Sequence, residues 1–178
     1  MLTITTLETG FRIGAALGLG AAVGFERQIG KHPAGLRTMT LISIGSAAFV
    51  LLVIEVGGKT NGLQSDAAAQ ATSRVLQGLT TGIGFLGAGT IVRADKNVHG
   101  LTTAAAVWCV AAIGAACGLG EIGLATMLTA AALLTLVIMK LCELPIRALG
   151  PKTKDTDAPL AQNASPAQST AVNSKHSD

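Results

Sequence analysis

Long apolar blocks alternate with short polar segments along the first 140 residues of the chain. Each block approaches the roughly 20 residues that a helix needs to cross a hydrocarbon layer. The pattern predicts an all-α fold, a polytopic membrane bundle of five transmembrane helices. The blocks are residues 9–26, 38–55, 75–92, 101–119 and 121–140. Four spans are the alternative, because Arg12 interrupts the first block and has to snorkel to the interface.

The composition changes near residue 145 and divides the chain into two parts. Residues 1–144 form the predicted transmembrane domain. Residues 145–178 are mostly polar residues, Ala and Pro, and contain few large apolar side chains. Such a segment buries too little apolar surface to offset the entropy lost on ordering. We therefore expect residues 145–178 to be a disordered cytoplasmic tail.

The positions of the basic residues predict the orientation of the chain. Lys and Arg outside the spans are retained on the cytoplasmic side during insertion. Ten of them belong to the first loop, the third loop and the C-terminal segment, against three on the opposite side. We therefore expect a multi-pass membrane protein with its N-terminus outside and its C-terminus in the cytoplasm.

Composition also argues against two classes of function. With four Phe, one Trp and no Tyr, the chain lacks the aromatic side chains on which nucleic-acid bases stack, so no nucleic-acid partner is expected. His32, His99 and His176 show no metalloprotease spacing, and no nucleophile-elbow motif is present. We expect a protein that is not an enzyme and that holds no cofactor, with Mg²⁺ as the one exception considered below.

Glycines recur four positions apart inside the apolar blocks, which places each pair on one helix face. Lipid offers little hydrophobic gain for helix association, so small residues favour packing by letting two backbones approach closely. The third block carries the largest set, and a hinge or unwound segment lining a pathway is the alternative there. The pairs are Gly14 and Gly18, Gly20 and Gly24, Gly78 and Gly82, and Gly114 and Gly118; the third-block set is Gly78, Gly82, Gly84, Gly87 and Gly89.

The first loop, residues 24–38, holds the candidate polar site. Glu26 and Arg27 end one span, while Arg37 and Thr38 begin the next, with a turn predicted between them by Pro33 and Gly35. Ionisable groups at the edge of a membrane bundle are candidate functional residues. The alternative is a structural ion pair between Glu26 and Arg37, accompanied by snorkelling basic residues.

The third loop adds Arg93 and Asp95 to this polar cluster on the same side of the membrane. Mg²⁺ prefers oxygen ligands and keeps several waters, so Glu26 and Asp95 together are candidate Mg²⁺ ligands. They are two carboxylates in separate loops with basic residues around them.

Several motifs together resemble the MgtC/SapB family of bacterial inner-membrane proteins over roughly residues 9–140. They are Gly24-Phe25-Glu26-Arg27, Ala34-Gly35-Leu36-Arg37-Thr38, the glycine-rich run of residues 82–89, and residues 100–105 with Trp108. The resemblance implies a role in adaptation to low magnesium and, in some pathogens, survival inside host cells. It also implies that members modulate other membrane proteins, including the rotary ATP synthase and P-type cation pumps. Longer members carry a soluble C-terminal domain, where this sequence has a polar tail from Pro151.

Three functional hypotheses follow. The first is a membrane-embedded regulator whose small-residue helix faces contact another membrane protein, with self-association as a further option. The second is a transporter or channel for Mg²⁺ or another small solute. The third is a structural membrane scaffold, for which neutralising Glu26, Arg27 and Arg37 would change stability alone.

Overall fold

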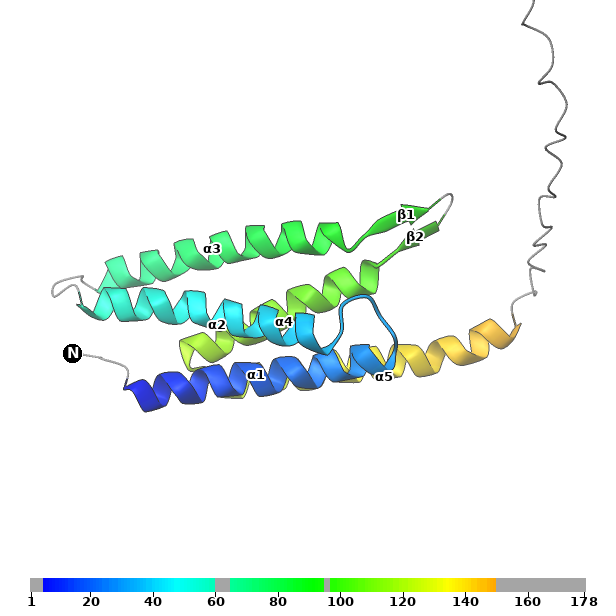
Figure 1. Ribbon diagram of the computed structural model, residues 1–178, viewed down its shortest axis with the longest axis horizontal. Helices are drawn as coiled ribbons and strands as arrows, with labels where there is room; N and C mark the ends of the chain where they lie inside the picture. Colours follow the sequence, from blue (N-terminus) through cyan, green and yellow to red (C-terminus); the bar gives the residue numbers. More distant parts are fainter. Residues whose placement is uncertain (1–4, 60–64, 95–96, 150–178) are drawn as a thin grey trace, which may run out of the picture.

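The computed structural model describes residues 5–59, 65–94 and 97–149, which form five helices and one short hairpin. The helices lie side by side, and successive helices run in opposite directions (Figure 1). The elements in chain order are α1 (Thr6–Ile29), α2 (Leu36–Lys59), α3 (Ser65–Gly89), β1 (Val92–Ala94), β2 (Asn97–His99), α4 (Leu101–Leu119) and α5 (Ile122–Leu149). The predicted all-α bundle is confirmed, with a small two-stranded ribbon added to it.

The helix boundaries differ most from prediction in α3. This helix starts ten residues before the predicted block, because the segment from Ser65 to Arg74 contains four alanines and favours a helix by propensity although it is too polar to be marked by hydropathy. Its predicted last residue, Val92, instead begins strand β1. Helix α5 continues through Pro145 to Leu149, past the predicted end of the transmembrane domain. The rest of the predicted tail lies outside the described residues.

Three helices in the described part of the chain are long and apolar enough to cross a membrane: α2, α4 and α5. Helix α1 is long enough but not apolar enough, because Glu8, Arg12, Glu26 and Arg27 lie within it. In α3 the polar first half has the same effect. The structure therefore supports a helical membrane bundle, in which α2, α4 and α5 are apolar enough to span a membrane.

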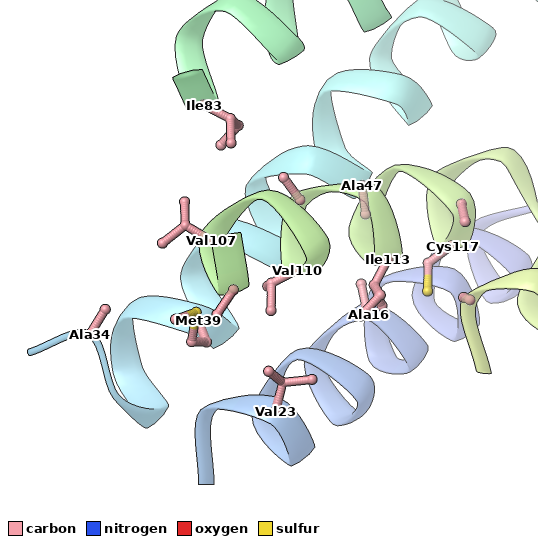
Figure 2. Packing of buried hydrophobic residues seen from close by; sticks show 14 residues of the cluster. Ala16, Val23, Ala34, Met39, Ala47, Ile83, Val107, Val110, Ile113 and Cys117 are labelled. Atoms are coloured by element: carbon pink, nitrogen blue, oxygen red, sulfur yellow. The ribbon is translucent and has the colours of Figure 1, made fainter. Parts of the chain in front are cut away.

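Helix α4 is the centre of the bundle and contacts all four other helices. Its buried residues run around most of its circumference, as expected for a helix enclosed by others. Figure 2 shows side chains of α1, α2 and α4 meeting in the core, among them Val23 of α1, Met39 of α2 and Val110 of α4. Helix α5 lies at the periphery and leaves most of its apolar surface exposed, which suits a helix facing lipid.

Close backbone contacts hold α1, α2 and α4 together. A Cβ atom added to Gly114 would lie 2.1 Å from the carbonyl oxygen of Ser43, and one added to Gly20 would lie 2.5 Å from Ser43 Cβ. Ser43 Oγ donates a buried hydrogen bond to the carbonyl oxygen of Ala16 at 2.7 Å. Glycine at these positions allows the three helices to approach within backbone contact.

A tight turn joins the last two helices. Gly120 ends α4 with a φ of 88°, a left-handed conformation that favours glycine. Arg12 of α1 lies against this turn and donates a hydrogen bond to the carbonyl oxygen of Gly118 at 2.9 Å, besides pairing with Glu8. Arg12 was expected to snorkel to the interface, but it binds the C-terminal end of α4, where a cation is favourable.

The α1–α2 loop, the β1–β2 hairpin and the C-terminal part of α5 lie at one end of the bundle (Figure 1). The predicted polar cluster belongs to this end. The other end holds the start of α1 and the α4–α5 turn.

Candidate functional site

Arg27 is the central residue of the candidate site and is buried almost completely, with 1% of its surface exposed. It lies in the last turn of α1, on the face that also buries Val23 and Gly24 against α2 and α4. Gly24 permits this burial, because a Cβ atom there would lie 2.8 Å from Leu36 Cα of α2. The close packing of α1 on α2 therefore carries the guanidinium into the bundle.

The guanidinium reaches the first turn of α4. Arg27 Nη2 donates a hydrogen bond to Thr103 Oγ1 at 2.7 Å, and Thr103 is itself 2% exposed. Burying a cation is costly unless it is paired or hydrogen-bonded, so this bond offsets part of the desolvation cost. The interpretation of Arg27 as a snorkelling residue is therefore wrong: the side chain points into the protein.

Two further buried polar atoms accompany this bond. Arg27 Nε and Glu26 Oε2 have no hydrogen-bond partner within the described ranges. The carboxylate of Glu26 attracts the guanidinium of Arg27 and so favours its charged form. The end of α1 thus places one acidic and one basic side chain at the edge of the bundle. One atom of each is available for a further hydrogen bond.

The loop after α1 turns the chain back and covers this end. His32 N–H donates to the carbonyl oxygen of Arg27 at 3.1 Å, and Lys31 adopts a φ of 54° in the turn. The His32 ring lies over Gly30, where a Cβ atom would approach its Cδ2 to 2.6 Å. Partial desolvation lowers the pKa of His32, and the positive charges of Arg27 and Lys140 lower it further, while Glu26 opposes them. The turn predicted from Pro33 and Gly35 is confirmed.

Among the described residues, the other members of the predicted polar cluster make no hydrogen bond or ion pair with Arg27. Arg37 and Thr38 lie exposed in the first turn of α2, and Arg93 is exposed on β1. No ion pair joins Glu26 to Arg37 in the described structure, so that predicted pairing is wrong. Asp95 lies outside the described residues, so the pair Glu26 and Asp95 stays a prediction as Mg²⁺ ligands. Over the described residues, no three His, Cys, Asp or Glu side chains form a group that can hold a metal ion.

The third-block glycines divide into two groups. Gly87 is buried, and a Cβ atom on it would lie 3.6 Å from Trp108 Cδ1 of α4, while one on Gly84 would lie 4.0 Å from Trp108 Cζ2. These two glycines therefore lie against α4. At Gly78, Gly82 and Gly89 a Cβ atom would meet nothing within 4 Å, so they do not pack within the described chain. The pair Gly14 and Gly18 is equally open, whereas Gly20 with Gly24 and Gly114 with Gly118 pack closely.

Sequence reasoning missed two residues of the site and its surroundings. Thr103 belongs to a motif that was noted, but its role as the partner of Arg27 was not predicted. Ser43, whose hydroxyl joins α2 to α1, was missed as well. The available signal was the presence of hydroxyl side chains inside otherwise apolar helices, where each needs a hydrogen-bond partner.

The fold and this site define a class: a helical membrane protein whose first helix places a buried arginine against the start of its fourth. A sequence profile of the MgtC family matches residues 13–144, and the chain belongs to that family. It is 47% identical over 128 residues to Protein SrpB of Synechococcus elongatus. The aligned region covers 66% of this chain and 68% of SrpB.

Proteins named MgtC are also similar to this chain. The identity to Protein MgtC of Brucella abortus is 44% over 111 residues, covering 62% of this chain and 42% of that protein. For Protein MgtC of Salmonella typhimurium it is 41% over 143 residues, covering 78% of this chain and 57% of that protein. The matched region thus spans only about half of the MgtC proteins. No solved structure matches this chain.

Proposed function

We propose that this chain is a multi-pass protein of the bacterial inner membrane that supports growth at low magnesium by binding laterally to other membrane proteins. Its membership of the MgtC family supports the magnesium role. In a pathogen, the same activity would contribute to virulence. The proposal assigns no catalytic step to the chain.

The observation that carries the lateral-binding proposal is the open glycine face of α3. Gly78, Gly82 and Gly89 have space around them, and the main contacts of α3 within the described chain are with α2 and α4. Between helices in lipid, attraction depends on close backbone approach, which such a face permits. A subunit of the rotary ATP synthase or a P-type cation pump is the proposed partner, and a second copy of this chain is the alternative.

A growth test with a matched glycine variant examines this proposal. In a deletion strain at limiting magnesium, we expect the intact gene to restore growth and Gly82→Leu to fail, because the added side chain blocks the close approach of a partner. Gly14→Leu is the control, since Gly14 is equally open but lies on α1. Membrane levels of each variant are measured alongside. Equal growth of the two variants at equal protein levels would refute the role of the α3 face.

Cross-linking from the same face identifies the partner. A photoreactive residue at position 78 or 82, with position 14 as the control, should yield one adduct with an ATP synthase or pump subunit, identified by mass spectrometry. An adduct with a second copy of this chain would instead support self-association. The absence of any specific adduct in native membranes would remove the basis for lateral binding.

The proposed orientation has its own test. Within the described ranges, Lys31, Arg37, Arg93 and Lys140 are exposed at the end of the bundle that is assigned to the cytoplasm. A cysteine replacing Glu121 should react with an impermeant maleimide in intact cells, and one replacing Arg93 should react only after permeabilisation. The reverse result would invert the orientation.

A second candidate function is transport of Mg²⁺ or another small solute. Its support is the pair of buried atoms Glu26 Oε2 and Arg27 Nε, because ionisable groups within a membrane bundle often mark ion pathways. Purified protein in liposomes should then move the ion down an imposed gradient, and Glu26→Gln should reduce the flux. An absence of flux would refute transport while leaving the lateral-binding proposal intact.

A further inference from the structure

The β1–β2 hairpin exposes branched apolar side chains on both of its faces. Val92 lies opposite His99, and Arg93 lies opposite Val98. Residues that are directly opposite share a face and successive residues alternate, so Val92 and Val98 lie on different faces. Their side chains are 58% and 48% exposed. An isolated two-stranded hairpin is marginally stable in water, so these faces indicate a less polar surrounding.

Helix α4 fixes where the hairpin lies relative to the bilayer. It begins at Leu101, two residues after the end of β2, and is long and apolar enough to cross a membrane. At 1.5 Å per residue, a helix of its length spans about 28 Å, close to the hydrocarbon thickness of about 30 Å. The start of α4 therefore coincides with the edge of the hydrocarbon layer.

The strands are too short to carry the hairpin far from this edge. A three-residue strand extends about 10 Å, and the headgroup layer on each side is roughly 5–8 Å deep. The base of the hairpin is also closely packed: Gly100 has a φ of 91°, and a Cβ atom there would lie 2.0 Å from the carbonyl oxygen of Thr90. The hairpin is thus placed in or directly above the headgroup layer.

The charge at this end of the bundle complements anionic headgroups. Arg93 is exposed on the same hairpin face as Val98, and Lys31, Arg37 and Lys140 are exposed at the same end. Glu26 is the partly buried carboxylate there. In the nearby sequence, Asp95 is balanced by Lys96 and Glu143 by Arg147, so neither pair changes the net positive charge.

We propose that the β1–β2 hairpin is an interfacial element that inserts Val92 and Val98 into the headgroup layer and binds anionic phospholipid through Arg93. A basic side chain near an anionic surface gains attraction to the phosphate groups, while the valines gain by leaving water. The inference depends only on the membrane location of the chain and goes beyond the proposed role at low magnesium.

A fluorescent label on the hairpin tests this proposal. Full-length protein with Val98→Cys, in a background of Cys109→Ser and Cys142→Ser, is labelled with an environment-sensitive nitrobenzoxadiazole dye; the buried Cys117 is retained. The protein is placed in nanodiscs of phosphatidylcholine with or without phosphatidylglycerol. The control label is at Glu121→Cys, in the turn at the other end of the bundle. Val92→Cys provides a second hairpin site if the first variant does not fold.

The expected result has two parts. The hairpin label should be quenched by a nitroxide attached at headgroup depth and should emit at shorter wavelength in discs with phosphatidylglycerol than in discs without it, whereas the emission of the control label should not depend on phosphatidylglycerol. Arg93→Gln should weaken the preference for phosphatidylglycerol about fivefold, the equivalent of about 1 kcal/mol for one basic residue near an anionic surface.

Three results would overturn the proposal. A hairpin label that emits like the free dye in water and is not quenched by the lipid nitroxide in either disc would place the hairpin in water. A shielded label that the lipid nitroxide does not quench would show that protein, such as a second copy of the chain, covers it. Equal shielding with and without phosphatidylglycerol, unaffected by Arg93→Gln, would exclude recognition of anionic lipid.

Discussion

Arg27 and Thr103 lie 76 positions apart in the sequence, yet Arg27 Nη2 donates a hydrogen bond to Thr103 Oγ1 at 2.7 Å. Both residues are buried, so the bond lies inside the bundle. It joins the last turn of α1 to the first turn of α4, the helix that contacts every other. The bond therefore adds one charge-assisted contact to the close packing that holds α4 beside α1.

Removing the acceptor of this bond should be more harmful than removing both partners. Thr103→Val is expected to lower the free energy of unfolding by about 1–3 kcal/mol, because it leaves buried guanidinium groups unsatisfied. The double variant Arg27→Met/Thr103→Val should recover much of that loss, since apolar side chains replace both partners. Thr103→Ser keeps the hydroxyl and serves as the control.

Denaturant unfolding in detergent measures these differences in a double-mutant cycle that includes Arg27→Met alone. An additive cycle, in which the two single effects sum to the double, would contradict an energetic coupling between the residues.

The contact of Gly114 with Ser43 gives a second prediction. Gly114→Ala should lower the free energy of unfolding by about 1–3 kcal/mol, because overpacking displaces backbone or side chains in a filled core. Here the added Cβ atom would meet the carbonyl oxygen of Ser43 at 2.1 Å, a backbone atom that cannot move without shifting α2.

Gly14→Ala is the matched control, since nothing lies within 4 Å of its added Cβ atom. It should be neutral or stabilise by up to about 1 kcal/mol through helix propensity. Thermal unfolding in detergent compares the two variants. A Gly114→Ala protein as stable as Gly14→Ala would show that α2 and α4 do not approach this closely.

The five helices were predicted from the sequence because each depends on a local property, the length of an apolar block. Which face of a helix is covered depends on its neighbours. The pairs Gly20 with Gly24 and Gly78 with Gly82 have the same spacing, yet only the first packs against another helix of the chain. Spacing identifies a face, whereas its partner is a tertiary property.

The same distinction explains the candidate site. A charge at the end of an apolar block predicts the end of a span, and this places Glu26 and Arg27 correctly at the end of α1. Whether Arg27 points to the interface or inward depends on Thr103, which is distant in sequence. The hairpin was missed because three-residue strands give little periodicity, although the β-branched residues Ile91, Val92 and Val98 were a usable signal.

Arg12 provides a prediction at the opposite end of the bundle. Arg12→Gln is expected to lower the free energy of unfolding by about 0.3–1 kcal/mol, because the cation interacts favourably with the C-terminal carbonyls of α4. Arg12→Lys, which keeps the charge, should lose less. Unfolding is measured at low and high salt, and the difference between the variants should shrink as salt screens the charge. A salt-independent difference would point to packing instead.

His32 gives a prediction about pH. Its pKa is lowered by partial desolvation and by the positive charges of Arg27 and Lys140. The unfolded chain therefore takes up a proton at His32 more readily than the folded protein does. The contribution of His32 to stability is complete above the ordinary histidine pKa of about 6.5 and is lost as the pH falls from there through the lower folded-state pKa.

The measurement is an NMR titration of the labelled His32 ring, together with unfolding at several pH values. The titration midpoint should lie below the ordinary histidine value, and Lys140→Gln should raise it by removing one repelling charge. His32→Gln, which does not titrate in this range, should remove the corresponding part of the pH dependence of unfolding. If Lys140→Gln leaves the midpoint unchanged, then α5 does not bring its basic residue close to the α1–α2 loop, and the packing at this end of the bundle would need to be different.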